Sequence, residues 1–214
     1  MRQLSGIDRL INEFDQSIRT IHATAPTTGR PYPAEGLVER TELTKQETRQ
    51  AGQLMRINHA GEVSAQGLYR GQAITAKNAE VRAQMQISAD EENDHLNWCE
   101  SRIKNLNTHT SFFNPVWYWG SFSIGALAGL AGDKWSLGFV KETEDQVVRH
   151  LDKHIAELPA NDLADLAILK KMKEDEQHHA DVAVKAGGIK LPWPIRKVTM
   201  PMMSKVMTSI SKRL

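Results

Sequence analysis

Apolar residues recur at every third or fourth position along most of the 214-residue chain, which is the spacing of one face of a helix. The first such run covers residues 3–22, and its apolar positions are Leu4, Ile7, Leu10, Ile11, Phe14, Ile18 and Ile21. No segment alternates with period two for long enough to indicate a strand. The pattern therefore predicts an all-α protein.

Local signals predict where the helices begin and end. Thr44 and Glu47 match a capping box, so we expect a helix to start there and to run to about Lys77. Asn78 is expected to cap the next helix, which should reach about Asn107. Two further helices are expected over residues 135–157 and from 161–162 to the glycine pair at 187–188.

These signals divide the chain into three parts. Residues 1–43 are expected to form an N-terminal amphipathic helix followed by a Pro/Gly linker, and residues 44–188 to form the helical bundle. Residues 189–214 are expected to form a basic amphipathic helix after Pro192 and Pro194.

One motif of the form Glu … Glu-x-x-His occurs twice in the expected bundle. Its residues are Glu62, Glu92 and His95 in the first copy and Glu144, Glu176 and His179 in the second. The upstream glutamate precedes its Glu-x-x-His by 30 and 32 residues. A single Glu-x-x-His arises often by chance, but two such motifs, each with a glutamate from a further helix, are how four-helix bundles hold two irons.

Periodicity indicates that these residues face the interior. Glu144 lies on the apolar stripe of its helix, whereas Glu142 falls on the polar face. His179 shares an apolar stripe with Glu176, and the neighbouring His178 points about 100° away. Four buried carboxylates need compensating charge, which two divalent metal ions would supply. Oxygen-rich ligation with one imidazole per metal favours iron or manganese over zinc.

Other polar residues near the motifs allow two interpretations. Asp94 and Asp175 either orient the ligand imidazoles or are solvated surface charges. Tyr69 either donates a hydrogen bond near the site or packs in the core, and Cys99 is expected to be a packed core thiol. Three histidines are expected to be ordinary helix or loop residues, namely His59, His109 and His154.

The composition of the chain limits the functions and the cellular compartments that we expect for the protein. The net charge is only +1, from 27 Lys and Arg against 26 Asp and Glu, which argues against a nucleic-acid-binding protein. With Cys99 as the one cysteine, no intrachain disulfide can form, as is typical of a reducing compartment. The N-terminus lacks a signal-peptide pattern, so we expect the cytoplasm or the cytoplasmic side of a membrane.

Two segments have the character of a membrane interface. Residues 112–132 carry no charge, but Asn, Pro, Ser and Gly dilute them too much for a convincing transmembrane helix. They contain Trp117, Tyr118 and Trp119, and the tail interleaves apolar residues with Lys and Arg. We therefore expect peripheral membrane binding, and the alternative is that both segments simply pack on the bundle.

The motifs and their flanking residues resemble the demethoxyubiquinone hydroxylases of ubiquinone biosynthesis. The resemblance covers about residues 44–214 and rests on four segments: 56–62, 92–96, Glu144 with His150, and 175–179. The sequence His-Ala-Gly-Glu at 59–62 is specific to that family, whereas Glu-x-x-His is shared by all ferritin-like diiron proteins. Residues 1–43 extend the chain beyond the length of the shortest family members.

The resemblance implies a ferritin-like four-helix bundle with extra membrane-interface helices. It also implies two iron ions per chain, bridged by Glu92 and Glu176. The implied iron ligands are Glu62, Glu92, His95, Glu144, Glu176 and His179. His150 matches a family histidine near the site and joins the four glutamates as a candidate catalytic residue.

The implied activity is that of a monooxygenase. One oxygen atom of O2 would enter the benzoquinol ring of a polyprenylated demethoxyubiquinol, and the other would leave as water. Two electrons would come from NADH, through an unconventional contact or through a partner such as a reductase or a ubiquinone-biosynthesis complex. The implied location is peripheral, on the cytoplasmic side of the cell inner membrane.

Other functions of a dimetal bundle stay open. A quinol oxidase of the alternative-oxidase type would reduce O2 fully to water, and a manganese catalase would need no quinol. A non-catalytic iron-binding bundle would need a polar exterior, which the long apolar segment and the tail argue against.

Overall fold

The computed structural model describes residues 6–37 and 42–214. Every regular element in these residues is helical, which confirms the all-α prediction. In chain order the elements are α1 (Gly6–His22), α2 (Lys45–Thr75), α3 (Ala79–Asn105), α4 (Asn114–Ala131), α5 (Asp133–Glu157), α6 (Leu163–Lys185), the short π-helical turn η1 (Ile195–Thr199) and α7 (Met200–Ser211).

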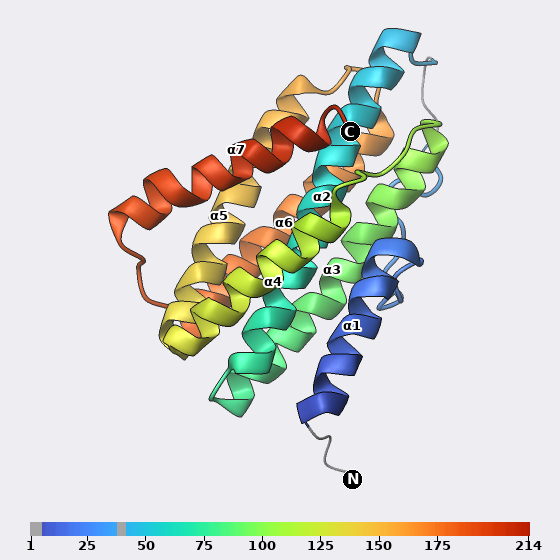
Figure 1. Ribbon diagram of the computed structural model, residues 1–214. Helices are drawn as coiled ribbons and strands as arrows, with labels where there is room; N and C mark the ends of the chain where they lie inside the picture. The colour runs from blue at the N-terminus through green and yellow to red at the C-terminus, as the bar shows by residue number, and fades with distance from the viewer. Residues whose placement is uncertain (1–5, 38–41) are drawn as a thin grey trace.

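Four long helices, α2, α3, α5 and α6, form a bundle (Figure 1). Helix α2 packs along α3, α5 packs along α6, and the two pairs meet through α3 and α6. Apolar side chains fill the interior, and the principal ones are Met55, Trp98, Ile103, Leu151, Ile168 and Met172. The two copies of the Glu … Glu-x-x-His motif thus come from all four helices of the bundle.

Side-chain caps explain where three of these helices begin. The Thr44 hydroxyl accepts from the Glu47 N–H, and the Glu47 carboxylate accepts from the Thr44 N–H, so the predicted capping box of α2 is confirmed. Asn78 caps α3, as predicted, and Asp162 caps α6. Local polar residues therefore fix the starts of α2, α3 and α6, whereas α5 has no side-chain cap.

The uncharged segment forms α4, which packs lengthwise on α2. Glycines allow the two backbones to approach closely: a Cβ at Gly125 would lie 2.2 Å from the Leu68 carbonyl oxygen, and a Cβ at Gly67 would lie 2.2 Å from that of Tyr118. Within the described residues, no helix has the length and apolarity needed to cross a membrane. The small residues of this segment therefore serve helix packing.

The N-terminal segment is attached to the bundle through both polar and apolar contacts. Arg70 on α2 makes two hydrogen bonds to the Glu13 carboxylate on α1. In the linker that follows, the Asn97 side chain donates to the Ala25 carbonyl at 2.8 Å, and Ala34 is buried. Four apolar side chains of α1 stay exposed, namely Ile7, Ile11, Phe14 and Ile18.

The C-terminal helix begins at the pair of prolines. Residues 186–192 are turn and coil, and helical backbone starts at Trp193, after Pro192. Helix α7 contacts α2, and in Figure 1 it crosses the face of the bundle that α2 and α5 present. The chain end is held by the Phe112 N–H, which donates to the Leu214 carbonyl at 3.0 Å.

Candidate metal centre

The six predicted ligands lie together in the middle of the bundle. Glu62 comes from α2, Glu92 and His95 from α3, Glu144 from α5, and Glu176 and His179 from α6. Their side chains are buried, with only 0–3% of each residue exposed. Ligand atoms of four of them lie within 4.8 Å of one another, namely those of Glu62, Glu92, His95 and Glu176, so this group can hold a metal ion.

The His95 imidazole faces three carboxylates with its Nδ1 atom. That atom lies 2.9 Å from Glu92 Oε2, 3.3 Å from Glu176 Oε1 and 3.6 Å from Glu62 Oε2. The i, i+3 spacing of Glu92 and His95 places both on one side of α3, as the motif predicts.

The second half of the site has a similar arrangement around His179. Its Nδ1 lies 3.2 Å from Glu92 Oε1 and 3.4 Å from Glu176 Oε2. Glu144 stands beside Glu176 and accepts a hydrogen bond from the Tyr69 hydroxyl at 2.7 Å. Tyr69 is also fully buried in an apolar cluster, so both of its expected roles, the hydrogen bond and core packing, are observed.

Glu92 and Glu176 each divide their two carboxylate oxygens between the two imidazoles. In both residues one oxygen faces His95 and the other faces His179, at 2.9–3.4 Å. Two carboxylates in this position are suited to bridge two cations, one beside each imidazole.

The buried site has more acidic than basic side chains, so bound cations would stabilise its ionised carboxylates. Burial, followed by the charge of Glu92, raises the pKa of Glu62 well above its usual value, and burial with Glu176 does the same for Glu144. Burial opposes charge at Glu92 and His95 as well, yet their mutual attraction lowers the pKa of Glu92 and raises that of His95. Four carboxylates thus share two imidazoles, which is too little positive charge for full ionisation.

Three buried ligand atoms have no hydrogen-bond partner, namely Glu92 Oε1, Glu176 Oε2 and His179 Nδ1. Buried polar atoms are nearly always hydrogen-bonded, so atoms that lack a partner and face one another indicate a missing binding partner. Carboxylate oxygens and imidazole nitrogens are the donors that iron and manganese accept. The residues present therefore fit a pair of divalent metal ions.

The outward nitrogen of each imidazole bonds to an acid that belongs to the other motif. His95 Nε2 lies 3.0 Å from Asp175 on α6, and His179 Nε2 lies 2.6 Å from Glu91 on α3. Such partners fix the ring and its tautomer in metal sites. Of the two acids whose role the sequence left open, Asp175 contacts a ligand imidazole, whereas Asp94 binds Thr28 and Arg30.

Sequence reasoning missed Glu91, although a signal was present. An acidic residue directly precedes the glutamate of each Glu-x-x-His, as Glu91 before Glu92 and Asp175 before Glu176. The repeat of that feature in both motifs marks it as part of the site.

His178 and Glu142, which the sequence analysis excluded as ligands, lie away from the ligand cluster. His178 is exposed, as predicted. Glu142 does face Gln146 and Arg149, but it is buried at 4% exposure, because Arg196 of the C-terminal segment also covers it at 3.7 Å. Glu142 therefore lies on the polar face of α5, as predicted, and the C-terminal segment covers that face at this point. Cys99 is a fully buried thiol, as predicted.

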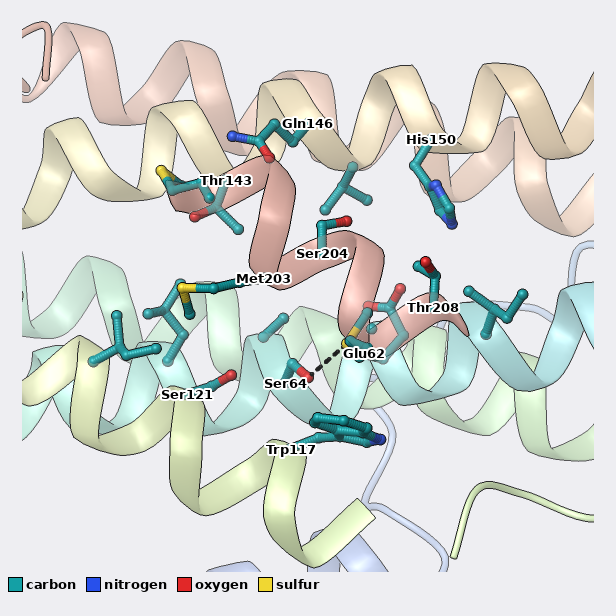
Figure 2. A pocket seen from close by; sticks show the side chains of 18 of the residues that line it. Glu62, Ser64, Trp117, Ser121, Thr143, Gln146, His150, Met203, Ser204 and Thr208 are labelled. Carbon is teal, nitrogen blue, oxygen red and sulfur yellow. Dashed lines mark hydrogen bonds between the residues drawn. The ribbon is translucent and has the colours of Figure 1, made fainter. Parts of the chain in front are cut away.

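An apolar pocket of about 420 Å³ reaches the centre from one side. It lies between α2, α4, α5 and α7, and Glu62, Glu144 and Glu176 form part of its wall. Figure 2 shows Glu62, Trp117 and Met203 around this space, with His150 on the α5 side. His150 is not among the clustered ligands; its Nε2 has no hydrogen-bond partner, and its ring lies 4.0 Å from that of His154.

Comparison with known proteins identifies the family. A family profile described as "Ubiquinone biosynthesis protein COQ7" matches residues 49–211. A protein named 3-demethoxyubiquinol 3-hydroxylase from Nitrosococcus oceani is 54% identical over 97% of this chain and 96% of its own. Proteins of the same name from Acinetobacter baumannii and Ectopseudomonas mendocina are 52% and 49% identical, over at least 98% of each chain. The chain therefore belongs to the COQ7 family of ubiquinone biosynthesis proteins.

Proposed function

We propose that this protein is a diiron monooxygenase that hydroxylates the benzoquinol ring of a polyprenylated demethoxyubiquinol. The name of its relatives, 3-demethoxyubiquinol 3-hydroxylase, supports the substrate and the reaction. The observation that carries the proposal is the pair Glu92 and Glu176, whose oxygens face both imidazoles beside an apolar pocket.

Each metal position has its own set of residues. Glu62 and His95 would hold one iron, Glu144 and His179 the other, and Glu92 and Glu176 would be shared. The irons, when bound, supply the redox chemistry that activates O2. Tyr69 holds the Glu144 carboxylate through its hydroxyl, which fixes the oxygen left free for the metal.

The pocket fits an apolar substrate whose reacting ring meets the centre. Its lining includes Ile57, Leu68, Ile124, Phe139 and Met207, while the three glutamates stand at the metal side. In the proposed reaction the ring C–H becomes C–OH, and the second oxygen atom leaves as water with two electrons and two protons from outside. His150 lines the pocket, and its Nε2 has no hydrogen-bond partner, so we propose that it binds a hydroxyl group of the quinol.

The electron source and the location extend this proposal. NADH is proposed as the ultimate donor, either directly or through a reductase or another protein of ubiquinone biosynthesis. Exposed apolar side chains on three elements support peripheral binding to the cytoplasmic side of the cell inner membrane. They include Ile11 on α1, Leu127 on α4 and Met202 on α7, each at least 61% exposed.

A single-turnover experiment tests the reaction. The purified chain is loaded with Fe(II) without oxygen, reduced, and mixed with a short-chain demethoxyquinol and isotopically labelled O2. Mass spectrometry is expected to find one labelled oxygen atom in the ring of the product. Consumption of O2 with oxidation of the quinol but no oxygen in the ring would instead indicate a quinol oxidase.

A further inference from the structure

Arg30, in the linker between α1 and α2, is bound to residues that surround the metal centre. Its Nε donates to Asp94 Oδ2 and its Nη1 to Asp175 Oδ2, both at 2.6 Å. Its Nη2 donates to the Glu91 carbonyl at 3.0 Å, and its guanidinium lies 5.0 Å from the centre of the Trp98 ring. One side chain of the linker thereby connects α3 to α6.

The backbone around Arg30 is fixed on the same acid. The Thr28 N–H donates to Asp94 Oδ1 at 2.9 Å, and the Thr28 hydroxyl donates to Asp94 Oδ2. Asp94 is only 1% exposed, so its charge depends on these linker groups for compensation. The linker is therefore anchored at this point, and Arg30 starts from a fixed backbone.

The contact with Asp175 leads directly to a proposed ligand. Asp175 Oδ2, which accepts from Arg30, lies 3.0 Å from His95 Nε2. Because His95 Nδ1 faces the cluster of glutamates, the proton of the neutral ring belongs on Nε2, where it can be donated to Asp175. The direction of the Asp175 carboxylate, and with it that of the imidazole, is set partly by Arg30.

We propose that Arg30 is a positioning residue of the metal centre, which orients His95 through Asp175 and so makes the N-terminal linker part of the site. This inference rests on the proposed metal-binding function. It gives a role to the segment 1–43, whose purpose the sequence did not indicate. Arg30 touches no proposed ligand itself and acts through a chain of two hydrogen bonds.

A purely structural role is the alternative. In that case Arg30 would only hold α3 to α6, and its loss would lower the stability of the fold while leaving the metals unaffected. The two roles differ in the metal that stands beside His95, because only a positioning role changes that metal and spares the one beside His179.

The test measures metal binding in the full chain. Fe(II) affinity is determined by competition with a chelator, and the two irons are compared by Mössbauer spectroscopy. For Arg30→Gln we expect affinity for one iron to fall about tenfold or more, with an altered signal for that iron and an unchanged signal for the other. The matched control is Glu13→Gln, which breaks a second arginine–carboxylate contact, that of Glu13 on α1 with Arg70 on α2. It should leave both signals and both affinities unchanged.

A double substitution separates an action through Asp175 from a general loosening of the fold. If Arg30 acts through Asp175, the variant Arg30→Gln with Asp175→Asn should lose no more affinity than Asp175→Asn alone. Fully additive losses, or an Arg30→Gln protein with wild-type affinity and wild-type spectrum, would overturn the inference.

Should Arg30→Gln not fold, Arg30→Lys is measured instead, since one ammonium group cannot replace the two-pronged guanidinium that binds both acids. Wild-type protein that binds no iron would overturn the metal centre itself.

Discussion

The residues of the centre contact one another across both halves of the site. Glu92 and Glu176 each direct one oxygen to His95 and the other to His179, so neither glutamate belongs to one half of the site. Glu144 lies outside the tightest group of four, and its position is fixed by Tyr69. Loss of a terminal ligand should therefore affect one metal first, whereas loss of a shared glutamate should affect both.

Replacement of Glu144 tests this division. In Glu144→Ala we expect the iron content to fall below two per chain and turnover to drop by at least about 100-fold, because in the proposed site Glu144 is a ligand of one metal only. Iron analysis and single-turnover kinetics measure the two effects. The matched control is Glu142→Ala on the same helix, which removes a buried carboxylate that faces Arg149 and Arg196. It should cost about 1–2 kcal/mol of stability but keep both irons. Full occupancy and activity in Glu144→Ala would contradict the site.

A buried histidine near the pocket predicts sensitivity to acid. Burial, with the charges of His150 and Lys212, lowers the pKa of His154 to about 3, from 6.5 for an exposed histidine. Between those values the unfolded chain binds more protons than the folded one. The contribution of His154 to the unfolding free energy therefore falls as the pH falls, by up to about 1.4 kcal/mol per pH unit.

The variant His154→Gln lacks this proton uptake. Its unfolding free energy relative to the wild type should therefore rise as the pH is lowered from 6.5 to 5, whatever its offset at neutral pH. Urea denaturation of the metal-free protein at several pH values provides the measurement. His22→Gln, at an exposed position, serves as the control. A difference between His154→Gln and wild type that does not change with pH would contradict the role of His154.

Sequence reasoning located the candidate site at the level of residues because a helix repeats its faces regularly. The i, i+3 pair at Glu176 and His179 selects one side of α6, and it excluded the exposed His178. The burial of Glu142 was not predictable from its helix, because the covering Arg196 comes from a segment more than fifty residues later. The same holds for Arg30, whose partners lie on α3 and α6.

At the scale of elements, the contact of α4 with α2 decides how the pocket is closed. Glycines on both helices bring the backbones together, so α4 forms one wall of the pocket through Trp117, Ser121 and Ile124. The sequence predicted helix boundaries well where a cap or a proline marks them, as at Thr44 and Asn78. It left open whether the uncharged segment lies in a membrane or on the bundle, because small residues favour close packing in both settings.

A pair of glycine substitutions on α4 tests this contact. Gly125→Ala would place a Cβ 2.2 Å from the Leu68 carbonyl oxygen, and we expect a loss of about 2–3 kcal/mol in stability. Gly120→Ala on the same helix meets no atom within 4 Å and should be neutral or stabilising, by up to about 1 kcal/mol. Thermal and urea denaturation give both values. Equal stability of the two variants would contradict the close packing of α2 and α4.

Many large apolar side chains are exposed on the surface of the molecule. They gather on α1, on α4 and on the segment from Trp193 to Leu214, which also includes one wall of the pocket. A substrate that lives in a lipid bilayer would meet these surfaces before it reaches the glutamates. The sequence predicted the amphipathic character of α1 and of the tail, but it could not show which apolar faces stay uncovered.

Charge placed on the tail tests the proposed membrane contact. The double variant Trp193→Glu with Val198→Glu alters two exposed side chains that do not line the pocket. Its binding to vesicles that contain anionic phospholipids should fall several-fold, with unchanged iron content. The control is Ile87→Glu with Val184→Glu, two apolar positions on α3 and α6 that are each at least 50% exposed. Equal sedimentation of both variants with vesicles would argue against a specific role of the tail.

The crossed bonds from Asp175 to His95 and from Glu91 to His179 have a consequence for the origin of the fold. Each copy of the repeated motif supplies an imidazole and a glutamate that faces both imidazoles, but the acid bonded to the outer nitrogen of this imidazole comes from the other copy. A helical hairpin with a single motif could complete such a centre only by pairing with a second copy of itself about a twofold axis. The present chain has the form expected if two such hairpins became joined, and after that each motif could change only in step with the other.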